Sequence, residues 1–206
     1  MATSRDAAAE AMRARLVQAA IEQLSLEGMR GVTHRRVEQR AEVSQGLVKY
    51  HFATLDGLIE AVVEELAALE IDAVMEVTPA QMAEANETGR MPTEVWVAAR
   101  DTWHRLTAHP HLTRARYEIF LHASRHPELQ GAIGRGRRRF LDATAASLSM
   151  ADDPVAAARM VIALVDGLLL HQLSAPEDDV DTLAPAYLLA AGTAAQLFPL
   201  DAGPRV

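Results

Sequence analysis

The segment Thr33–Phe52 (THRRVEQRAEVSQGLVKYHF) constrains the fold of this chain more than any other stretch, because it predicts two short helices around a tight turn. Thr33 is a favourable N-cap residue, although Arg36 stands where a capping box needs an acid or an amide. Val37 and Ala41 are four residues apart and therefore share one face of the first helix.

The second half of the segment predicts another short helix. Val43 lies in the turn, and Ser44 is expected to cap the helix. Val48 and Phe52 again share a face, so the apolar residues of both helices can form a small core. The remaining side chains face outward and are rich in donors for phosphate oxygens and base edges: Arg35, Arg36, Arg40, Gln45, Leu47, Lys49, Tyr50 and His51. The pattern favours a DNA-reading helix-turn-helix over an ordinary helix pair with a solvated basic face.

Charge is unevenly distributed along the chain. The formal net charge is −8, but residues 1–52 hold 8 basic against 6 acidic side chains, and the remainder holds 12 against 22. Contacts to phosphate act within a Debye length of about 8 to 10 Å, so a locally basic head can bind a polyanion despite an acidic body.

Composition narrows the class of protein. The chain of 206 residues is half hydrophobic, which suits one large domain or two small ones. Cysteine is absent, which excludes disulfides and thiolate metal sites. The N-terminus lacks an apolar signal region, and the apolar stretch Val161–Leu170 is interrupted by Asp166 and is too short to span a bilayer. We expect a soluble cytoplasmic protein without a membrane partner.

Helical spacing of apolar residues recurs along almost the whole chain, which predicts an all-α fold. Gly28 is expected to end a first helix, Thr54 to cap a long one, and Thr78–Pro92 to form a loop. The stripes of these two helices are Leu16, Val17, Ala20, Ile21 and Leu24, then Leu58, Ala61, Val62, Leu66 and Leu69. Further helices are expected over residues 93–108, 111–125, 128–148 and 154–173, with a last helix ending near Phe198.

Residues 12–66 resemble the TetR family of transcriptional regulators, because they combine an apolar helix, a glycine, the AEVSQG turn and the YHF ending. The resemblance implies a DNA-binding head (1–53) and a helical effector-binding and dimerisation domain (54–206), with a homodimer formed mainly by the last two helices. Such a protein represses from a palindromic operator and is released by a small hydrophobic or amphipathic effector. An activator of the same family, or a helical ligand-binding or partner-binding protein without specific DNA binding, remains an alternative.

The resemblance also implies roles for residues of the head. Gly46 would allow a close approach to the duplex, and base-proximal contacts are expected from Gln45, Leu47 and Lys49. Phosphate contacts are expected from Thr33, Arg36, Tyr50 and His51, and the DNA-binding set is completed by Arg35, Ser44 and Thr54. The family usually has a lysine where this chain has Leu55, so the hydroxyl of Thr54 and the helix amides would have to replace that phosphate contact.

The effector pocket is expected among apolar and aromatic residues on helices that surround the cavity in the resembling family: Trp96, Trp103, Tyr117, Phe120, Met160 and Leu164. Asp166 and His171 could orient a polar group of the ligand. The alternative is that these side chains are ordinary core. Small residues concentrate in Ala184–Leu197 and would let two helices approach closely across a dimer.

Other patterns carry no assigned site. His122 and His126 are four residues apart, but no third ligand stands at a readable spacing, so a surface role is favoured over a metal site. The run Gly134–Phe140 (GRGRRRF) is better explained as a solvated helix face than as a second DNA contact. No nucleophile elbow or phosphate loop is present in the sequence, and we expect neither an enzyme nor a cofactor.

Overall fold

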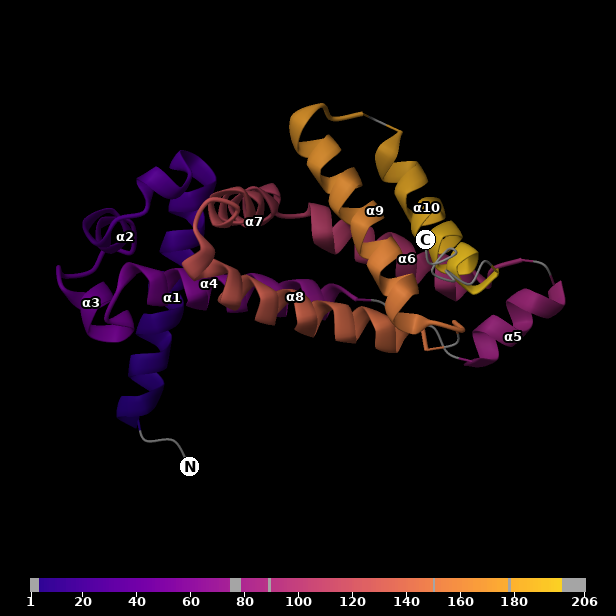
Figure 1. Cartoon of the computed structure of the whole chain (residues 1–206), viewed down its shortest axis with the longest axis horizontal. Helices are drawn as coiled ribbons and strands as arrows, with labels where there is room; N and C mark the ends of the chain where they lie inside the picture. Colours follow the sequence, from indigo (N-terminus) through magenta and orange to yellow (C-terminus); the bar gives the residue numbers. More distant parts are fainter. Residues whose placement is uncertain (1–3, 75–78, 89, 150, 178, 198–206) are drawn as a thin grey trace, which may run out of the picture. The chain divides into compact units, whose positions relative to one another are not determined.

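A computed structural model describes residues 4–74, 79–88, 90–149, 151–177 and 179–197, and within these ranges the regular structure is helical (Figure 1). This confirms the expected all-α class. The elements are α1 (Ser4–Glu27), the 3-10 turn η1 (Met29–Gly31), α2 (His34–Arg40), α3 (Leu47–Phe52), α4 (Leu55–Ala73), α5 (Pro79–Thr88), α6 (Thr93–Thr107), α7 (Pro110–Ala123), α8 (Pro127–Ser147), α9 (Pro154–Ser174) and α10 (Val180–Leu197).

The chain divides into two compact units. Unit 1 comprises Met1–Leu69 and Pro110–Arg137, and unit 2 comprises Glu70–His109 and Arg138–Val206. Helices α4 and α8 therefore contribute residues to both units. The functional division after residue 53 stays a prediction, and the compact unit that holds the first helices also includes α7.

The core of unit 1 joins α1 to the helix-turn-helix, to α4 and to α7. The predicted stripe of α1 is buried, with Leu16, Ile21 and Leu24 each at 0% exposure. Buried side chains of the other elements complete the cluster: Val37, Val48, Phe52, Leu58, Val62, Leu66, Ala115 and Ile119. Burying a large apolar side chain contributes about 1.5 to 3 kcal/mol. The cluster therefore fixes the positions of α2 and α3 against the other helices of unit 1.

Two predicted helix boundaries in unit 1 are confirmed. Gly28 follows the end of α1 with φ +65°, and its N–H donates to the carbonyl of Leu24 at 2.9 Å. A glycine favours this left-handed conformation because it has no Cβ. The hydroxyl of Thr54 accepts the N–H of Gly57 at 3.0 Å, so Thr54 caps the start of α4 as expected.

The expected loop over Thr78–Pro92 is wrong for most of its length, because Pro79–Thr88 forms α5. The segment PAQMAEANET opens with proline, which suits the first helical position, and then contains several good helix formers. Of the turn-forming residues that suggested a loop, Asn86 lies within this helix, and Gly89, like Thr78, lies outside the described residues. The four helices expected between residues 93 and 173 are confirmed to within two residues at each end.

Unit 2 is built around α6, α9 and α10. Trp103 of α6 is fully buried, and its Nε1–H donates to Oδ1 of Asp181 on α10 at 2.8 Å. Helices α9 and α10 lie side by side (Figure 1). Buried side chains on these two helices include Val165 and Leu169 of α9 and Leu188 of α10.

Helix α9 leaves much of its apolar surface exposed. The helix has 21 residues, and only 22% of its most apolar stretch is buried. Among the described helices, only α9 is long and apolar enough to cross a membrane by length and composition. The expectation that the apolar stretch Val161–Leu170 is too short to span a bilayer is therefore wrong, because the helix extends beyond that stretch. Length and composition do not distinguish a membrane span from a helix that a protein surface covers.

Candidate nucleic-acid interface

The first helix of the helix-turn-helix begins and ends with defined caps. The hydroxyl of Thr33 accepts the N–H of Arg36 at 3.3 Å, which confirms Thr33 as the N-cap of α2. At the other end the N–H of Glu42 donates to Gln39 O at 3.1 Å, and that of Val43 donates to Glu38 O at 3.0 Å. This pair of bonds is a Schellman motif, in which the residue with positive φ is usually glycine. Here it is Glu42, with φ +53°.

The second helix does not begin at Ser44 as the sequence suggested. Helix α3 begins at Leu47, and its N-cap is Gly46, at φ +95°, without a side-chain cap. Instead, the carboxylate of Glu38 lies beneath the turn and accepts the N–H groups of Gly46 and Val48 at 2.9 and 3.0 Å. Glu38 is 3% exposed, and sequence reasoning missed it.

The predicted base-proximal residues surround the start of α3. Gln45, Gly46 and Lys49 are exposed, and a Cβ built on Gly46 would meet no atom within 4 Å. The glycine is therefore needed for its φ, since nothing in the described part of the chain crowds that face. Leu47 is half-buried and packs against the core of unit 1, so only part of its side chain is available to a partner.

Several predicted phosphate-contacting groups already have partners inside unit 1. Arg36 forms a salt bridge with Glu27, and Arg40, expected to face outward, donates to Oε1 of Gln23 on α1 at 3.0 Å. The carbonyl of His51 accepts a hydrogen bond from Arg13 of α1 at 2.5 Å. These contacts brace both helices against α1, and Arg36 would have to exchange a carboxylate for a phosphate.

The exposed end of the head combines cations with an aromatic ring. Arg35 and Lys49 are exposed, and neither has an ion-pair partner among the described residues. Tyr50 is 77% exposed, and its ring packs edge-on against His51 with centroids 4.9 Å apart. Ser44 and Thr54 are also exposed. An exposed large aromatic next to the exposed Lys49 on α3, with the exposed Arg35 on α2, suits contact with a nucleic-acid backbone.

The predicted effector residues fall into two groups. Tyr117 and Phe120 belong to unit 1, where the guanidinium carbon of Arg116 lies 4.8 and 5.8 Å from their ring centroids. The others belong to unit 2, where Trp103 is engaged with Asp181, Trp96 is 42% exposed, and His171 lies 3.0 Å from Glu177. On α9, the half-buried members of the set are Met160, Leu164 and Asp166.

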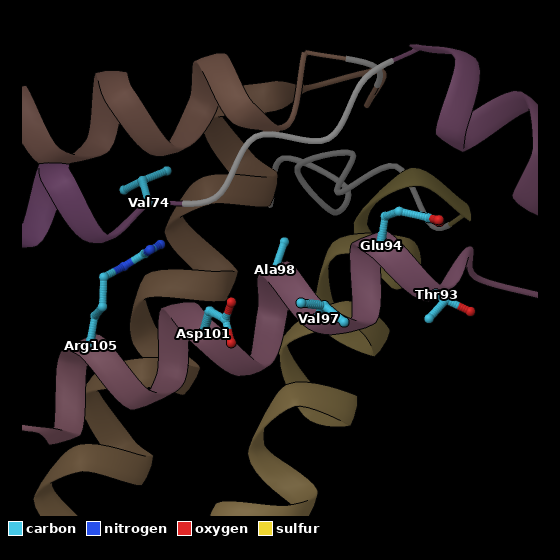
Figure 2. A pocket seen from close by; sticks show the side chains of 7 residues that line it. All are labelled: Val74, Thr93, Glu94, Val97, Ala98, Asp101 and Arg105. Carbon is cyan, nitrogen blue, oxygen red and sulfur yellow. The ribbon is translucent and has the colours of Figure 1, made fainter.

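A cavity in unit 2 lies beside α6 (Figure 2). Its volume is about 560 Å³, and it is lined by Val74, Thr93, Glu94, Val97, Ala98, Asp101 and Arg105. None of the predicted effector residues lines it, and the lining combines an apolar floor with two carboxylates. Arg105 is held by the carbonyl of Ala73 at 3.1 Å, and Asp101 lies 3.5 Å from Arg100. Volumes of about 300 to 1,000 Å³ are usual for small-molecule sites.

The geometry of His122 and His126 argues against a shared metal ion. Their rings are stacked 3.8 Å apart and inclined by only 10°. The nitrogen lone pairs therefore lie in nearly parallel planes and cannot converge on one ion. Burial, with His126 and Arg125 nearby, lowers the pKa of His122, which disfavours two charged rings in contact. In the described residues no group of three or more potential ligands could hold a metal.

Two family models match this chain. Residues 16–62, which contain α2 and α3, match the model described as bacterial regulatory proteins, tetR family. Residues 90–194 match the model described as Tetracyclin repressor-like, C-terminal domain. Together the two models cover residues 16–62 and 90–194, which include most of the head and most of the helices that follow.

Individual relatives agree with the family models. The HTH-type transcriptional regulator BetI of Paraburkholderia phytofirmans is 40% identical over 52 residues, which are 25% of this chain and 27% of that protein, so the match spans about a quarter of the relative. A putative TetR-family regulator from Rhodococcus sp. has the same fold, with a TM-score of 0.69 and 21% identity over 91% of this chain and 99% of the other. The structure of the multidrug binding protein EbrR with imidazole has a TM-score of 0.61 and 25% identity, and the match covers 94% of this chain and 98% of the other.

Proposed function

Because this chain belongs to the tetR family of bacterial regulatory proteins, we propose that it is a cytoplasmic, ligand-responsive repressor that binds a palindromic operator as a homodimer. A small hydrophobic or amphipathic effector releases it. The observation that carries the proposal is the polar face of α3, which stays exposed while Val48 and Phe52 anchor the same helix in the core. Such a helix is free to lie in the major groove.

Within this proposal the head divides its contacts between bases and phosphates. Gln45 and Lys49 approach base edges, with the exposed part of Leu47 beside them, and Gly46 allows the duplex backbone to come close. Arg35 and Tyr50 contact phosphates, together with Thr33, Arg36, Ser44, His51 and Thr54. Phosphate contacts set the register, whereas base contacts set the sequence.

The dimer is proposed to form through α9 and α10. Exposed residues Val155, Ala163, Gly167 and Leu170 follow one face of α9, and a Cβ on Gly167 would meet no atom of the described residues within 4 Å. A second subunit on this face would cover apolar surface that is otherwise exposed and would explain the high hydropathy of α9 without a membrane. Two α3 helices about 34 to 36 Å apart would then read both halves of an operator.

Effector binding is proposed to act on the head through α7 as well as α4. Ala115 and Ile119 of α7 are in the same core as α1, and Tyr117 and Phe120 extend from the same helix. A ligand that moves α7 therefore disturbs the support of the helix-turn-helix. The ligand releases DNA only if it binds more tightly to the conformation in which the heads are wrongly spaced.

The test is binding of the full chain to the duplex upstream of its own gene, measured by fluorescence anisotropy at several salt concentrations. We expect Lys49→Ala to weaken specific binding by about 1 to 3 kcal/mol, as for a lost base contact, while helical content is unchanged. Arg90→Ala removes the same charge from an exposed site in unit 2 and serves as the matched control. Equal affinity of Lys49→Ala and Arg90→Ala would reject the head assignment.

A further inference from the structure

Glu38 is a buried acidic residue at the centre of the helix-turn-helix. It lies on α2, next to the core residue Val37, and is 3% exposed. Its side-chain Oε1 accepts the N–H of Gly46 at 2.9 Å and that of Val48 at 3.0 Å, while its main-chain carbonyl accepts the N–H of Val43 at 3.0 Å. One residue of the first helix thus holds three amides across the turn and the start of α3.

These bonds supply what the start of α3 lacks. The first amides of a helix have no partner within it, and a side chain at the N-cap usually accepts one of them. The N-cap here is Gly46, which has no side chain, and no side-chain cap bond forms from that position. A carboxylate is a strong acceptor for such amides, because the start of the helix carries partial positive charge.

The two amides also fix the direction of α3. They lie on either side of Leu47, the first residue of the helix, and they bond to a single oxygen that α2 holds in the interior. A change in that oxygen's position would move the start of α3 relative to α2. Gln45 and Lys49, whose exposed side chains are proposed to reach the bases, would move with it.

We propose that Glu38 is a positioning residue that sets the pose of the DNA-reading helix, and that it acts on operator selection without touching DNA. This inference rests on the proposed DNA-binding function. Its distinguishing consequence concerns specificity: a loosened α3 keeps its cations and its affinity for any duplex, but loses the alignment that base contacts require.

The test compares Glu38→Gln with Glu38→Met in the full chain. Both variants remove the same charge and place a side chain of similar length in the same site, but only glutamine keeps an oxygen that can accept the two amides. Both residues are good helix formers, so neither change weakens α2 by itself. Glu10→Gln, at an exposed site on α1, controls for loss of a negative charge from the head.

We expect Glu38→Gln to keep the ratio of specific to nonspecific affinity, and Glu38→Met to lower that ratio about tenfold while nonspecific binding is unchanged, since an unsatisfied buried amide is costly. Retention of the wild-type ratio by Glu38→Met would overturn the proposal. Equal loss of specific and nonspecific binding, with helical content retained, would also overturn it, because Glu38 would then support affinity in general and not the alignment of α3.

Amide hydrogen exchange gives a readout that needs no DNA. In the wild-type protein the amide of Gly46 should exchange slowly although the residue is exposed, and this protection should persist in Glu38→Gln and be lost in Glu38→Met. Fast exchange at Gly46 in the wild type would directly refute the hydrogen bond between Gly46 and Glu38, even if Glu38→Met did not fold. If the amides were protected but the chain bound no operator, the proposed function would be refuted, while the hydrogen bonds of Glu38 to the start of α3 would be supported.

Discussion

Replacing Glu42 with glycine should stabilise the protein, because Glu42 occupies a position where an L-residue is strained. Its φ is +53°, and the two hydrogen bonds of the Schellman motif hold it there. The left-handed conformation costs an L-residue about 1 to 2 kcal/mol. Glycine removes that cost but loses about 0.5 to 1 kcal/mol through the greater freedom of the unfolded chain.

The ion pair that Glu42 would lose contributes little. Its carboxylate lies 3.9 Å from Arg15, and the two side chains are 86% and 51% exposed. Solvent screens a pair of this kind, whose usual contribution is about 0 to 1 kcal/mol, and the long distance places it near the lower limit. The net expectation for Glu42→Gly is a gain of about 0.5 kcal/mol, or about 1 to 2 °C in Tm for a chain of this size.

Chemical denaturation followed by circular dichroism measures this gain, with Glu64→Gly as the matched control. Glu64 is exposed within α4, where the same substitution should lower the free energy of unfolding by about 1 kcal/mol. The two glycine variants should therefore lie on opposite sides of the wild type. Destabilisation of both by the same amount would show that the φ of Glu42 carries no strain and would refute the reasoning.

Two further changes test the supports of the head. Gly28→Ala should lower the free energy of unfolding by about 1 kcal/mol, because an L-residue at φ +65° is strained. The new Cβ would lie 2.8 Å from Oε2 of Glu118, but that atom ends a flexible side chain that can move aside, so adding Glu118→Ala should recover little of the loss. An unchanged denaturation midpoint in Gly28→Ala would contradict this. The pKa of His122 is lowered in the folded protein, although Glu128 and Asp56 oppose the shift. The stability that the neutral ring contributes should therefore be present above the unfolded pKa of 6.5 and be lost as the pH falls through the folded pKa. His122→Gln should flatten that part of the stability profile, and a ring titration of His122 by NMR at or above 6.5 would contradict the expected sign.

The sequence predicted the elements whose residues act locally. Thr33 capped α2 and Gly28 ended α1 because each outcome depends on one side chain and its nearest backbone neighbours. The stripes of α1 and α4 were confirmed for the same reason, since helical spacing alone determines which residues share a face. Leu69 is an exception at 39% exposure, because it is where α4 leaves unit 1.

The features that the sequence did not reveal depend on partners distant along the chain. Ser44 looked like the cap of α3, but the acceptor is Glu38, eight residues before Gly46 and separated from it by a turn. The signal that could have found Glu38 was an acidic residue directly beside the core residue Val37, because a carboxylate that becomes buried there needs hydrogen-bond donors. The cavity beside α6 was missed because the sequence analysis looked for a pocket among apolar and aromatic residues, whereas this cavity is lined in part by the carboxylates of Glu94 and Asp101.

The most direct test of the account is whether DNA covers the exposed face of α3. Lys49 is the only lysine in the sequence, so an amine-reactive acetylating reagent reports on that face at a single side chain, with the amino terminus as internal reference. We predict that the upstream duplex slows acetylation of Lys49 relative to the amino terminus, that a scrambled duplex does so less, and that high salt abolishes the protection. Unchanged acetylation of Lys49 in the presence of excess upstream duplex would contradict the proposal that α3 reads DNA.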